Sequence, residues 1–195
     1  MLLEDTRVNP SAENNYAFRF ACEYGRTDSV KILLEDKRVN PSAEDDYAIR
    51  FAVENGRTDV VNMLIQDDRV NPSADDNFPI KRASACGYTD IVKMLLEDTR
   101  VNPSAEDDYA IRVAAQNGHI EVVKMLLQDD RVEPSAIDDY LIRIACESGY
   151  TDIVKMVLDD KRFVLKDALI KTLLLGLLPP EIRELLEEKV SNTEQ

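Results

Sequence analysis

Residues 38–68 decide the fold, and they read RVNPSAEDDYAIRFAVENGRTDVVNMLIQDD. Two apolar-rich stretches of this segment flank Gly56, which can supply the left-handed residue that commonly ends a helix. In the second stretch the apolar pairs recur four residues apart, at Val60-Val61 and Leu64-Ile65, so a helix here has one wide apolar face. We therefore predict two short helices joined by a tight turn.

Polar residues of the segment indicate where the two helices begin. Asp45 and Asp46 precede the first stretch, where carboxylates can cap a helix and complement the positive end of its dipole. Thr58 precedes the second stretch and is the expected N-cap there. Pro41 ends regular structure ahead of the first helix, so we expect a compact, proline-stiffened loop between one helix pair and the next.

The same segment recurs along the chain every 31 residues. Arg-Val opens each copy, and Asn-Pro-Ser-Ala follows it in the first four. The predicted repeats cover residues 7–37, 38–68, 69–99, 100–130 and 131–161. Residues 1–6 are identical to residues 94–99, so the chain is expected to open with half of a repeat. Because helices of about two turns are marginal alone and cannot bury their apolar faces within one copy, the copies have to stack.

Stacked copies of this kind predict an all-α fold, a solenoid of helix-turn-helix repeats. We assign residues 1–161 to the repeat array and residues 162–195 to C-terminal capping helices. The stretch from Phe163 to Leu177 reads as an apolar helix that can cover the last repeat, and Pro180 suits the first turn of another helix. The apolar face of this last helix is marked by Ile182, Leu185, Leu186 and Val190.

In the quoted repeat, Tyr47-Ala48-Ile49-Arg50-Phe51-Ala52 opens the first helix, and Gly56 and Val60-Val61 follow. This pattern resembles the ankyrin repeat, which runs about 33 residues with Thr-Pro-Leu-His-x-Ala at the first helix. The resemblance covers residues 1–161 and implies an ankyrin-like solenoid that binds other proteins without catalysis. Each copy is two residues shorter than the family's repeat, and this favours a compact loop over a long β-hairpin between repeats.

Two sets of charged residues recur at fixed repeat positions. A cation replaces the family's histidine, and the resemblance implies that it hydrogen-bonds between repeats as the histidine does. This set consists of Arg19, Arg50, Lys81, Arg112 and Arg143. The second set pairs an Asp with the Arg two residues later, as in Asp36 and Arg38. We expect this second ladder to be structural, exposed and therefore weak.

The charge of the chain restricts its partners. The sequence holds 38 acidic against 24 basic residues, a net charge of −14. This balance argues against nucleic acid and against anionic membrane surfaces, and it favours a protein with a basic contact patch. No apolar run is long enough to span a bilayer. Three cysteines and no signal-peptide pattern then lead us to expect a soluble, reducing compartment such as the cytoplasm.

Residues that carry most enzyme chemistry are scarce, so we predict no catalytic activity, no cofactor and no metal site. His119 is the only histidine, and it stands where other copies have Arg or Tyr, which favours a structural role. Cys22 and Cys146 share one apolar repeat position and are expected in the core, whereas Cys86 is expected to be exposed. The Asp-rich segments lack the alternating ligands and central Gly of a calcium-binding loop.

A surface for a protein partner remains. In the ankyrin family partners lie against the loops between repeats and the exposed end of the first helix, so the resemblance implies contacts at the matching positions here. Most of these residues are acids or amides, which form a stripe of negative potential able to steer a basic partner. The candidate contact residues are Glu44, Asp46, Glu54, Asn55, Asp75, Asn77, Lys81, Arg82, Ala85, Cys86, Glu106, Asp108, Gln116 and Asn117.

The third repeat departs most from the others, over residues 78–86. Arg82 stands where the other copies have an apolar residue, and because a guanidinium is not buried unpaired, it should reach the surface or meet a carboxylate such as Glu54. Ala85 replaces an acid and Cys86 an amide, so this repeat is less negative than its neighbours, as the centre of an interface within a charged rim would be. Drift in one repeat explains the same pattern.

The C-terminal tail leaves one functional alternative. Leu178-Pro179-Pro180-Glu181-Ile182 resembles the opening of an F-box, so residues 178–190 could recruit ubiquitin-ligase machinery. Only seventeen residues follow Leu178, which is too few for the remaining F-box helices. A capping helix is therefore the favoured interpretation of this tail.

Overall fold

The computed structural model describes residues 9–132, 138–160, 162–163 and 178–193. The predicted half repeat at residues 1–6 lies outside the described residues, and so does the predicted apolar helix from residue 164 to residue 177. The described part is helical and contains no strand. The all-α fold is thereby confirmed, and a compact loop stands where a hairpin would have joined the repeats.

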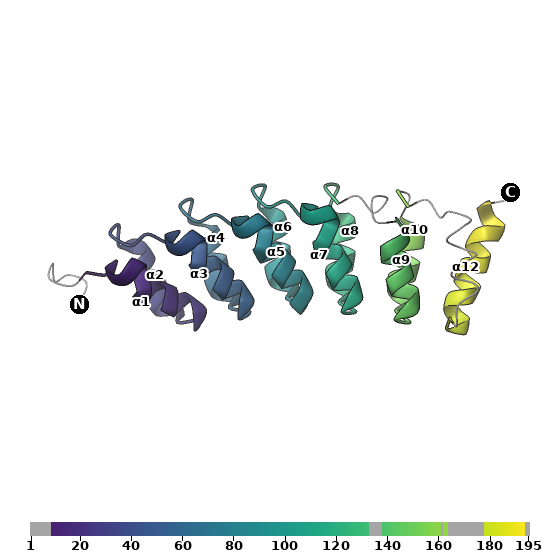
Figure 1. The fold of residues 1–195 in the computed structure, drawn as a ribbon, viewed down its shortest axis with the longest axis horizontal. Helices are drawn as coiled ribbons and strands as arrows, with labels where there is room; N and C mark the ends of the chain where they lie inside the picture. Colours follow the sequence, from purple (N-terminus) through teal and green to yellow (C-terminus); the bar gives the residue numbers. More distant parts are fainter. Residues whose placement is uncertain (1–8, 133–137, 161, 164–177, 194–195) are drawn as a thin grey trace. The chain divides into compact units, whose positions relative to one another are not determined.

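Each repeat contributes a first and a second helix (Figure 1). The first helices are α1 Ala12–Glu23, α3 Ala43–Glu54, α5 Ala74–Cys86, α7 Ala105–Gln116 and α9 Asp138–Glu147. The second helices are α2 Thr27–Glu35, α4 Thr58–Ile65, α6 Thr89–Glu97, α8 Ile120–Gln128 and α10 Thr151–Asp159. A last helix, α12 Pro180–Thr193, follows them. Every repeat is thus the helix-turn-helix that its two apolar stretches predict.

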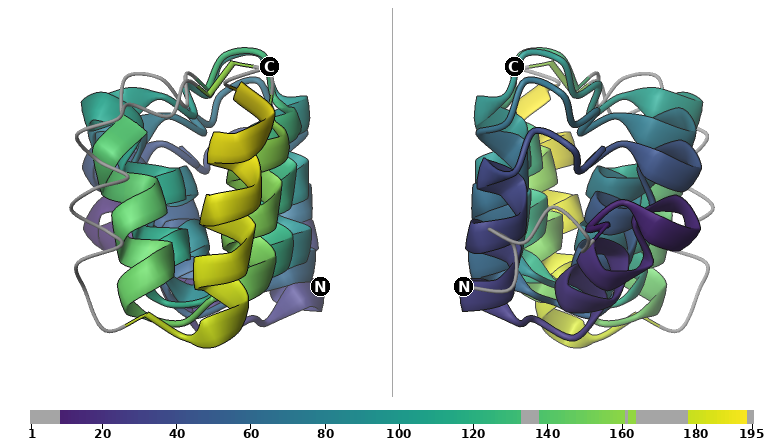
Figure 2. Two further views of the ribbon diagram at one scale, coloured as in Figure 1. Left: turned by 90° about the vertical axis from the view of Figure 1, so that its right-hand side faces the viewer. Right: turned by 90° about the vertical axis from the view of Figure 1, so that its left-hand side faces the viewer.

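These helices gather into two compact units. The N-terminal unit runs up to Ala83 and includes Tyr88–Asn102, whereas the C-terminal unit consists of Ser84–Gly87 and the chain from Pro103 onward. In the N-terminal unit α1 packs on α3, α2 on α4 and α4 on α6; in the C-terminal unit α7 packs on α9 and α8 on α10. Within each unit, first and second helices form two layers (Figure 2). Each unit is therefore a stack of repeats, as expected of a solenoid.

A hydrophobic core lies between the two layers of each unit. Val61 and Leu64 of α4 are fully buried, while Ile65 is only half-buried, so the apolar stripe faces inward as its spacing predicts. Cys22 and Cys146 are also fully buried, which confirms their predicted place in the core. Burial of such apolar area is the main favourable contribution to stability.

The turn between the two helices of a repeat depends on its glycine. Gly118 has φ of +72°, and a Cβ built there would lie 2.7 Å from Cζ of Tyr150 in the next repeat. Gly87 is approached in the same way by the ring of His119, whose Nε2 lies 3.0 Å from the carbonyl oxygen of Ala85. The carbonyl can only accept, so Nε2 donates. The predicted structural role of His119 is confirmed.

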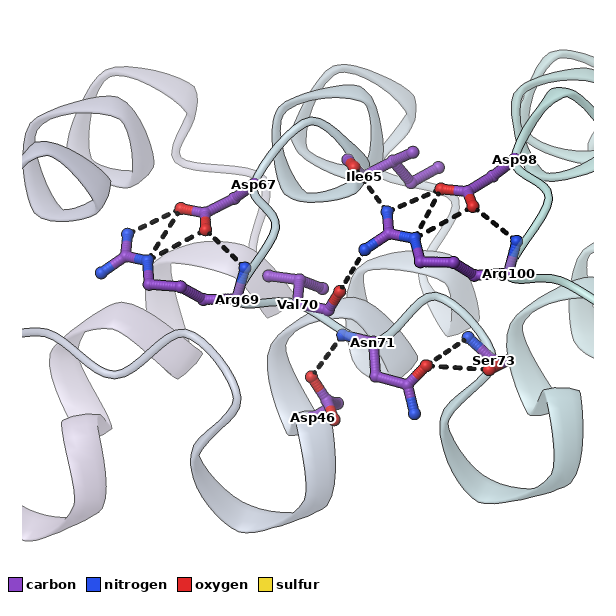
Figure 3. A network of polar contacts seen from close by, with 9 residues as sticks. All are labelled: Asp46, Ile65, Asp67, Arg69, Val70, Asn71, Ser73, Asp98 and Arg100. Carbon is purple, nitrogen blue, oxygen red and sulfur yellow. Dashed lines mark hydrogen bonds and ion pairs between the residues drawn. The ribbon is translucent and has the colours of Figure 1, made fainter.

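The Asp-Arg ladder joins neighbouring repeats (Figure 3). Arg100 pairs with Asp98 at 2.6 Å, as the sequence predicts. Its guanidinium also donates to the carbonyl oxygens of Ile65 in the second repeat and Val70 in the third, both at 3.0 Å. Ile65 ends α4, so the cation meets the negative end of the α4 dipole. The expectation of a weak surface pair is therefore incomplete, because Arg69, Arg100 and Arg162 also bind backbone carbonyls of earlier repeats.

Acid should weaken this ladder over a defined range. The hydrogen bonds from Arg38 lower the pKa of Asp36 to about 2, and the arginine two residues later lowers the pKa of Asp67 and Asp98 in the same way. An unfolded aspartate titrates at about 3.9. Because the folded pKa is lower, stability from these groups is complete above about pH 4 and is lost as pH falls towards 2.

We expect the urea midpoint, followed by circular dichroism, to drop between pH 4 and pH 2. Asp67→Asn should lower the midpoint at pH 7 and reduce the drop on acidification. Asp46 has the opposite effect on stability as the pH falls, because burial raises its pKa and its protonation therefore favours the folded chain. A variant with the same acid-induced drop as the wild type would show that the ladder does not set the acid sensitivity.

Helix α12 covers α10 in the C-terminal unit. Ile182 and Leu186 are fully buried, and Lys189 Nζ donates to the carbonyl oxygen of Leu158 near the end of α10. Lys189 thus places a cation at the C-terminal end of α10, as Arg100 does at the C-terminal end of α4. Pro179 lies by Gly149. This helix therefore takes the position of a further second helix, which supports the capping interpretation of the tail.

Candidate functional site

In each of the helices α1, α3, α5 and α7, three consecutive residues near the start adopt a left-handed backbone. We call these segments the left-handed turns; they are Glu13–Asn15, Glu44–Asp46, Asp75–Asn77 and Glu106–Asp108, with φ between 51° and 62°. An L-residue in this region costs about 1–2 kcal/mol, and Asn and Asp tolerate it best. This backbone therefore suits the Asn and Asp residues of the turns, whereas it does not account for Glu13, Glu44 and Glu106.

The predicted helix caps are therefore wrong. Asp45 and Asp46 lie inside a left-handed turn, and the right-handed part of α3 begins only at Tyr47. Thr58 is the first residue of α4, and the N-cap position is held by Arg57 without a side-chain capping bond. The φ of +63° at Gly56 confirms the predicted left-handed end of the first helix.

Arginines of the first helices bind the left-handed turns. Arg50 donates from Nε to the carbonyl oxygen of Asp45 at 2.9 Å and from Nη2 to that of Glu44 at 3.2 Å. Arg19 binds the carbonyl oxygen of Asn14 at 2.9 Å in the same way. These bonds stay within one repeat, so the predicted hydrogen bonds between repeats are wrong for Arg19. The exposed carbonyls of the turn are the nearer acceptors.

These arginines also contact the next repeat. The guanidinium of Arg19 lies over the ring of Tyr47 at 4.9 Å, and that of Arg112 lies 5.5 Å from the ring of Tyr140. Such cation–π contacts contribute about 0.5–2 kcal/mol. Arg50 adds a hydrogen bond and ion pair with Asp75 at 3.4 Å, so the predicted hydrogen bond between repeats is confirmed for Arg50. A stacked cation thus joins repeats where the family has a bonded histidine.

The third residue of the first three left-handed turns joins repeats as well. Asp46 accepts the backbone N–H of Asn71 at 2.9 Å, and Asn77 accepts that of Asn102 at 2.7 Å. Asp108 holds the same position and is only 3% exposed. Three candidate contact residues, Asp46, Asn77 and Asp108, therefore serve the fold rather than offer a surface to a partner.

The first two residues of each turn are exposed. Glu44, Asp75 and Glu106 among the candidates lie here, and the structure adds their neighbours Asp45, Asp76 and Asp107, which the position match to the family missed. Within the described residues, the side chains of Glu13, Asp45 and Asp76 have no hydrogen-bond or ion-pair partner. Each turn therefore presents carboxylates to solvent.

The remaining candidates lie at or near the C-terminal ends of the first helices. Arg82 pairs with Glu54 at 2.8 Å, which confirms the predicted carboxylate partner. In the same N-terminal unit Asn55 is exposed and Lys81 is half-buried. In the C-terminal unit Ala85 and Cys86 are half-buried, so Cys86 is less open than expected, while Gln116 and Asn117 are exposed. Asn117 donates to the carbonyl oxygen of Ala85 at 2.8 Å.

Sequence reasoning missed a row of aromatic side chains on α1. Tyr16, Phe20 and Tyr24 are 53%, 43% and 48% exposed. Ring centroids lie 5.9 Å apart for Tyr16 and Phe20 and 4.4 Å apart for Phe20 and Tyr24. Residues four apart share one face of a helix. Only the first repeat has an aromatic residue at all three positions, and this signal was available in the sequence.

The Cys146 thiol and the His119 ring are both engaged in packing. Burial raises the pKa of the Cys146 thiol to about 12, so it stays protonated, and His119 is held against Gly87. Within the described part of the chain no group of His, Cys, Asp and Glu side chains could hold a metal ion. Nor does any helix among those residues have the length and apolar character to cross a membrane.

Comparison with known families agrees with this architecture. The family model for ankyrin repeats, which describes three copies, matches residues 1–76, 18–107, 55–138 and 80–167. These overlapping matches cover all five predicted repeats. No curated protein matches the chain.

Proposed function

Because the chain belongs to the ankyrin-repeat family, whose members are generally protein–protein interaction modules, we propose that it is a non-catalytic scaffold for a partner with a basic contact patch. The exposed carboxylates of the left-handed turns carry this proposal. A left-handed backbone accounts for Asn or Asp at these positions, but Asn would satisfy it without charge. The negative charge itself is not needed for the fold.

Neighbouring cations cancel only part of this charge, because Arg50 pairs with Asp75 and Arg82 pairs with Glu54. Arg19 is bound to turn carbonyls, and Arg57 donates to the carbonyl oxygen of Glu23 at 3.0 Å. The net charge of −14 acts in the same direction. A basic protein is therefore attracted over a distance and oriented towards the turns.

We place the contact surface in each unit separately. In the N-terminal unit it comprises the first two residues of each left-handed turn together with Glu54 and Asn55. In the C-terminal unit it comprises Glu106, Asp107, Gln116 and Asn117. We also propose a reducing compartment such as the cytoplasm, because Cys22, Cys86 and Cys146 are all free thiols. Binding centred on the third repeat stays a prediction. The guanidinium of Arg82, which distinguishes this repeat, already pairs with Glu54.

An adaptor role for the C-terminal tail is the weaker alternative. Ile182 and Leu186 are fully buried, and Lys189 is bound to α10. A recruiting tail would have to expose these apolar side chains, at a cost of about 1.5–3 kcal/mol for each. The capping contacts therefore favour the scaffold over the adaptor.

Charge removal at the turns should slow binding without unfolding the chain. Glu13→Gln, Asp45→Asn and Asp76→Asn together remove three exposed carboxylates. Asn tolerates the left-handed backbone as Asp does, and Gln keeps the size and shape of the Glu side chain. The association rate with a partner captured on the wild-type chain, measured by biolayer interferometry, should fall about tenfold at low salt. The difference should shrink as salt rises, since charges are screened over about 8–10 Å at physiological ionic strength.

The matched control removes equal charge elsewhere in the N-terminal unit. Asp28→Asn, Asp59→Asn and Asp90→Asn neutralise exposed residues at the starts of the second helices. This control should keep most of the wild-type rate. Equal association rates for the two triple variants, or a wild-type association rate that does not change with salt, would contradict the proposed acidic binding surface.

A further inference from the structure

The aromatic row on α1 identifies the chemistry of the partner. We propose that Tyr16, Phe20 and Tyr24 form a docking site for an arginine-bearing segment of the partner protein, with a guanidinium stacked on the ring of Tyr16. This inference rests on the proposed scaffold function and specifies what the partner presents to it.

Elsewhere the chain shows what covers a ring at this repeat position. Tyr47 is the counterpart of Tyr16 in the second repeat, and the Arg19 guanidinium lies 4.9 Å from its centroid. The hydroxyl of Tyr47 donates to Oε2 of Glu23 at 2.8 Å. Burial and this contact raise the pKa of Tyr47 to about 12. In the fifth repeat, Arg112 lies 5.5 Å from the ring of Tyr140. At this position the fold thus repeatedly places a guanidinium on a tyrosine.

Tyr16 has the same position without the cation. Its ring is 53% exposed, and among the described residues no guanidinium or ammonium lies over it. Phe20 and Tyr24 extend the exposed aromatic surface along α1. Aromatic side chains grouped on a surface are typical of interface centres, because they bury much area at little entropic cost.

The charges around the row suit an arginine. Glu13 precedes Tyr16 by three residues and is exposed, while Glu23 adjoins Tyr24 and is half-buried. The nearby Arg19 is engaged by the carbonyl oxygens of Glu13 and Asn14. An incoming cation therefore meets rings and carboxylates. Arginine fits better than lysine, since its planar, weakly hydrated guanidinium stacks on aromatic faces.

A labelled peptide tests this site on the full chain. The probe is a short fluorescein-labelled peptide of alternating arginine and leucine, and its affinity is read by fluorescence anisotropy. Tyr16→Ala combined with Phe20→Ala should weaken binding about tenfold, whereas Tyr16→Phe, which keeps the ring, should retain it. Replacing the peptide's arginines by lysine should also weaken binding.

Tyr109→Ala is the matched control, because Tyr109 occupies the Tyr16 position in the fourth repeat and is 40% exposed. It should leave peptide affinity unchanged. Circular dichroism should show that all variants keep their helices, since the replaced rings are largely outside the core. Equal losses for Tyr109→Ala and the double variant, or full binding by the double variant, would overturn the site.

The proposed function and this site fail in different ways. Peptide binding that falls with the three turn substitutions but ignores Tyr16 and Phe20 would support an acidic scaffold and overturn the aromatic site. Peptide binding that is lost without the rings but unchanged by the turn substitutions and by salt would contradict the acidic surface and support the aromatic site. Sedimentation showing a dimer that Phe20→Ala dissociates would overturn the site too, since the row would then join two copies of the chain.

Discussion

Replacing Leu64 by alanine should lower the free energy of unfolding by about 2–5 kcal/mol. Leu64 is fully buried on the inner face of α4. Loss of its side chain removes apolar contacts and leaves a cavity that neighbouring repeats fill only in part. Urea denaturation followed by helical circular dichroism measures the change.

Leu33→Ala supplies the comparison within the same chain. Leu33 holds the repeat position of Leu64 in the first repeat, but it is only half-buried. Leu33→Ala should lower the free energy of unfolding clearly less than Leu64→Ala, because a partly open site leaves no closed cavity. A loss at Leu33 equal to that at Leu64 would mean that burial between the layers does not determine stability here.

Gly118→Ala should be destabilising by about 2–5 kcal/mol, the sum of a left-handed backbone penalty and the strain of overpacking. Gly118 has φ of +72°, and the new Cβ would meet the ring of Tyr150 at 2.7 Å. The ring is stiff, so it cannot give way without moving its helix. Thermal unfolding of the wild type and the variant measures the loss.

Two further variants separate the two contributions. In the background of Tyr150→Ala the clash is absent, so Gly118→Ala should cost only the backbone penalty of about 1–2 kcal/mol. Gly25→Ala has a similar φ of +67° but faces the flexible side chain of Arg57. Gly25→Ala should therefore lower the free energy of unfolding by little more than the backbone penalty. Identical losses at Gly25 and Gly118 would show that contact with the next repeat is irrelevant.

Features that depend on a period were predictable from the sequence. The 31-residue repeat, the paired helices and the buried stripe of α4 follow from spacing alone. The ion pair of Arg82 with Glu54 also followed from a simple rule, since a cation among apolar positions needs a carboxylate.

The left-handed turns could not be distinguished from helix caps. Asp and Asn favour both places, for the same reason that their short side chains bond nearby backbone groups. Asp45 and Asp46 were therefore assigned to a cap, and the bonds of Arg19 and Arg50 to turn carbonyls of their own repeats were not predicted. Both features depend on backbone direction, which a residue pattern does not record. Three successive left-handed residues are rare enough that propensity alone does not suggest them.

The candidate site was partly predictable for a related reason. Exposed acids such as Glu44 follow from charge and repeat position, but their neighbours at the third turn position serve the fold. Aromatic residues at helical spacing are usually core residues, so Tyr16 and Phe20 gave no sign of exposure. In the second repeat the counterpart of Tyr16 is indeed covered by Arg19. Only the structure shows that Tyr16 has no such cover among the described residues.

Hydrogen exchange of the full chain, with and without a captured partner, shows which surface of the repeats the partner covers. A protein-binding scaffold that uses the turns and the α1 row should show slower exchange over residues 13–24 and 44–55 when the partner is bound. Exchange in the second helices α2 and α4 should stay unchanged. Protection confined to α2 and α4, with no change over the left-handed turns, would contradict the account.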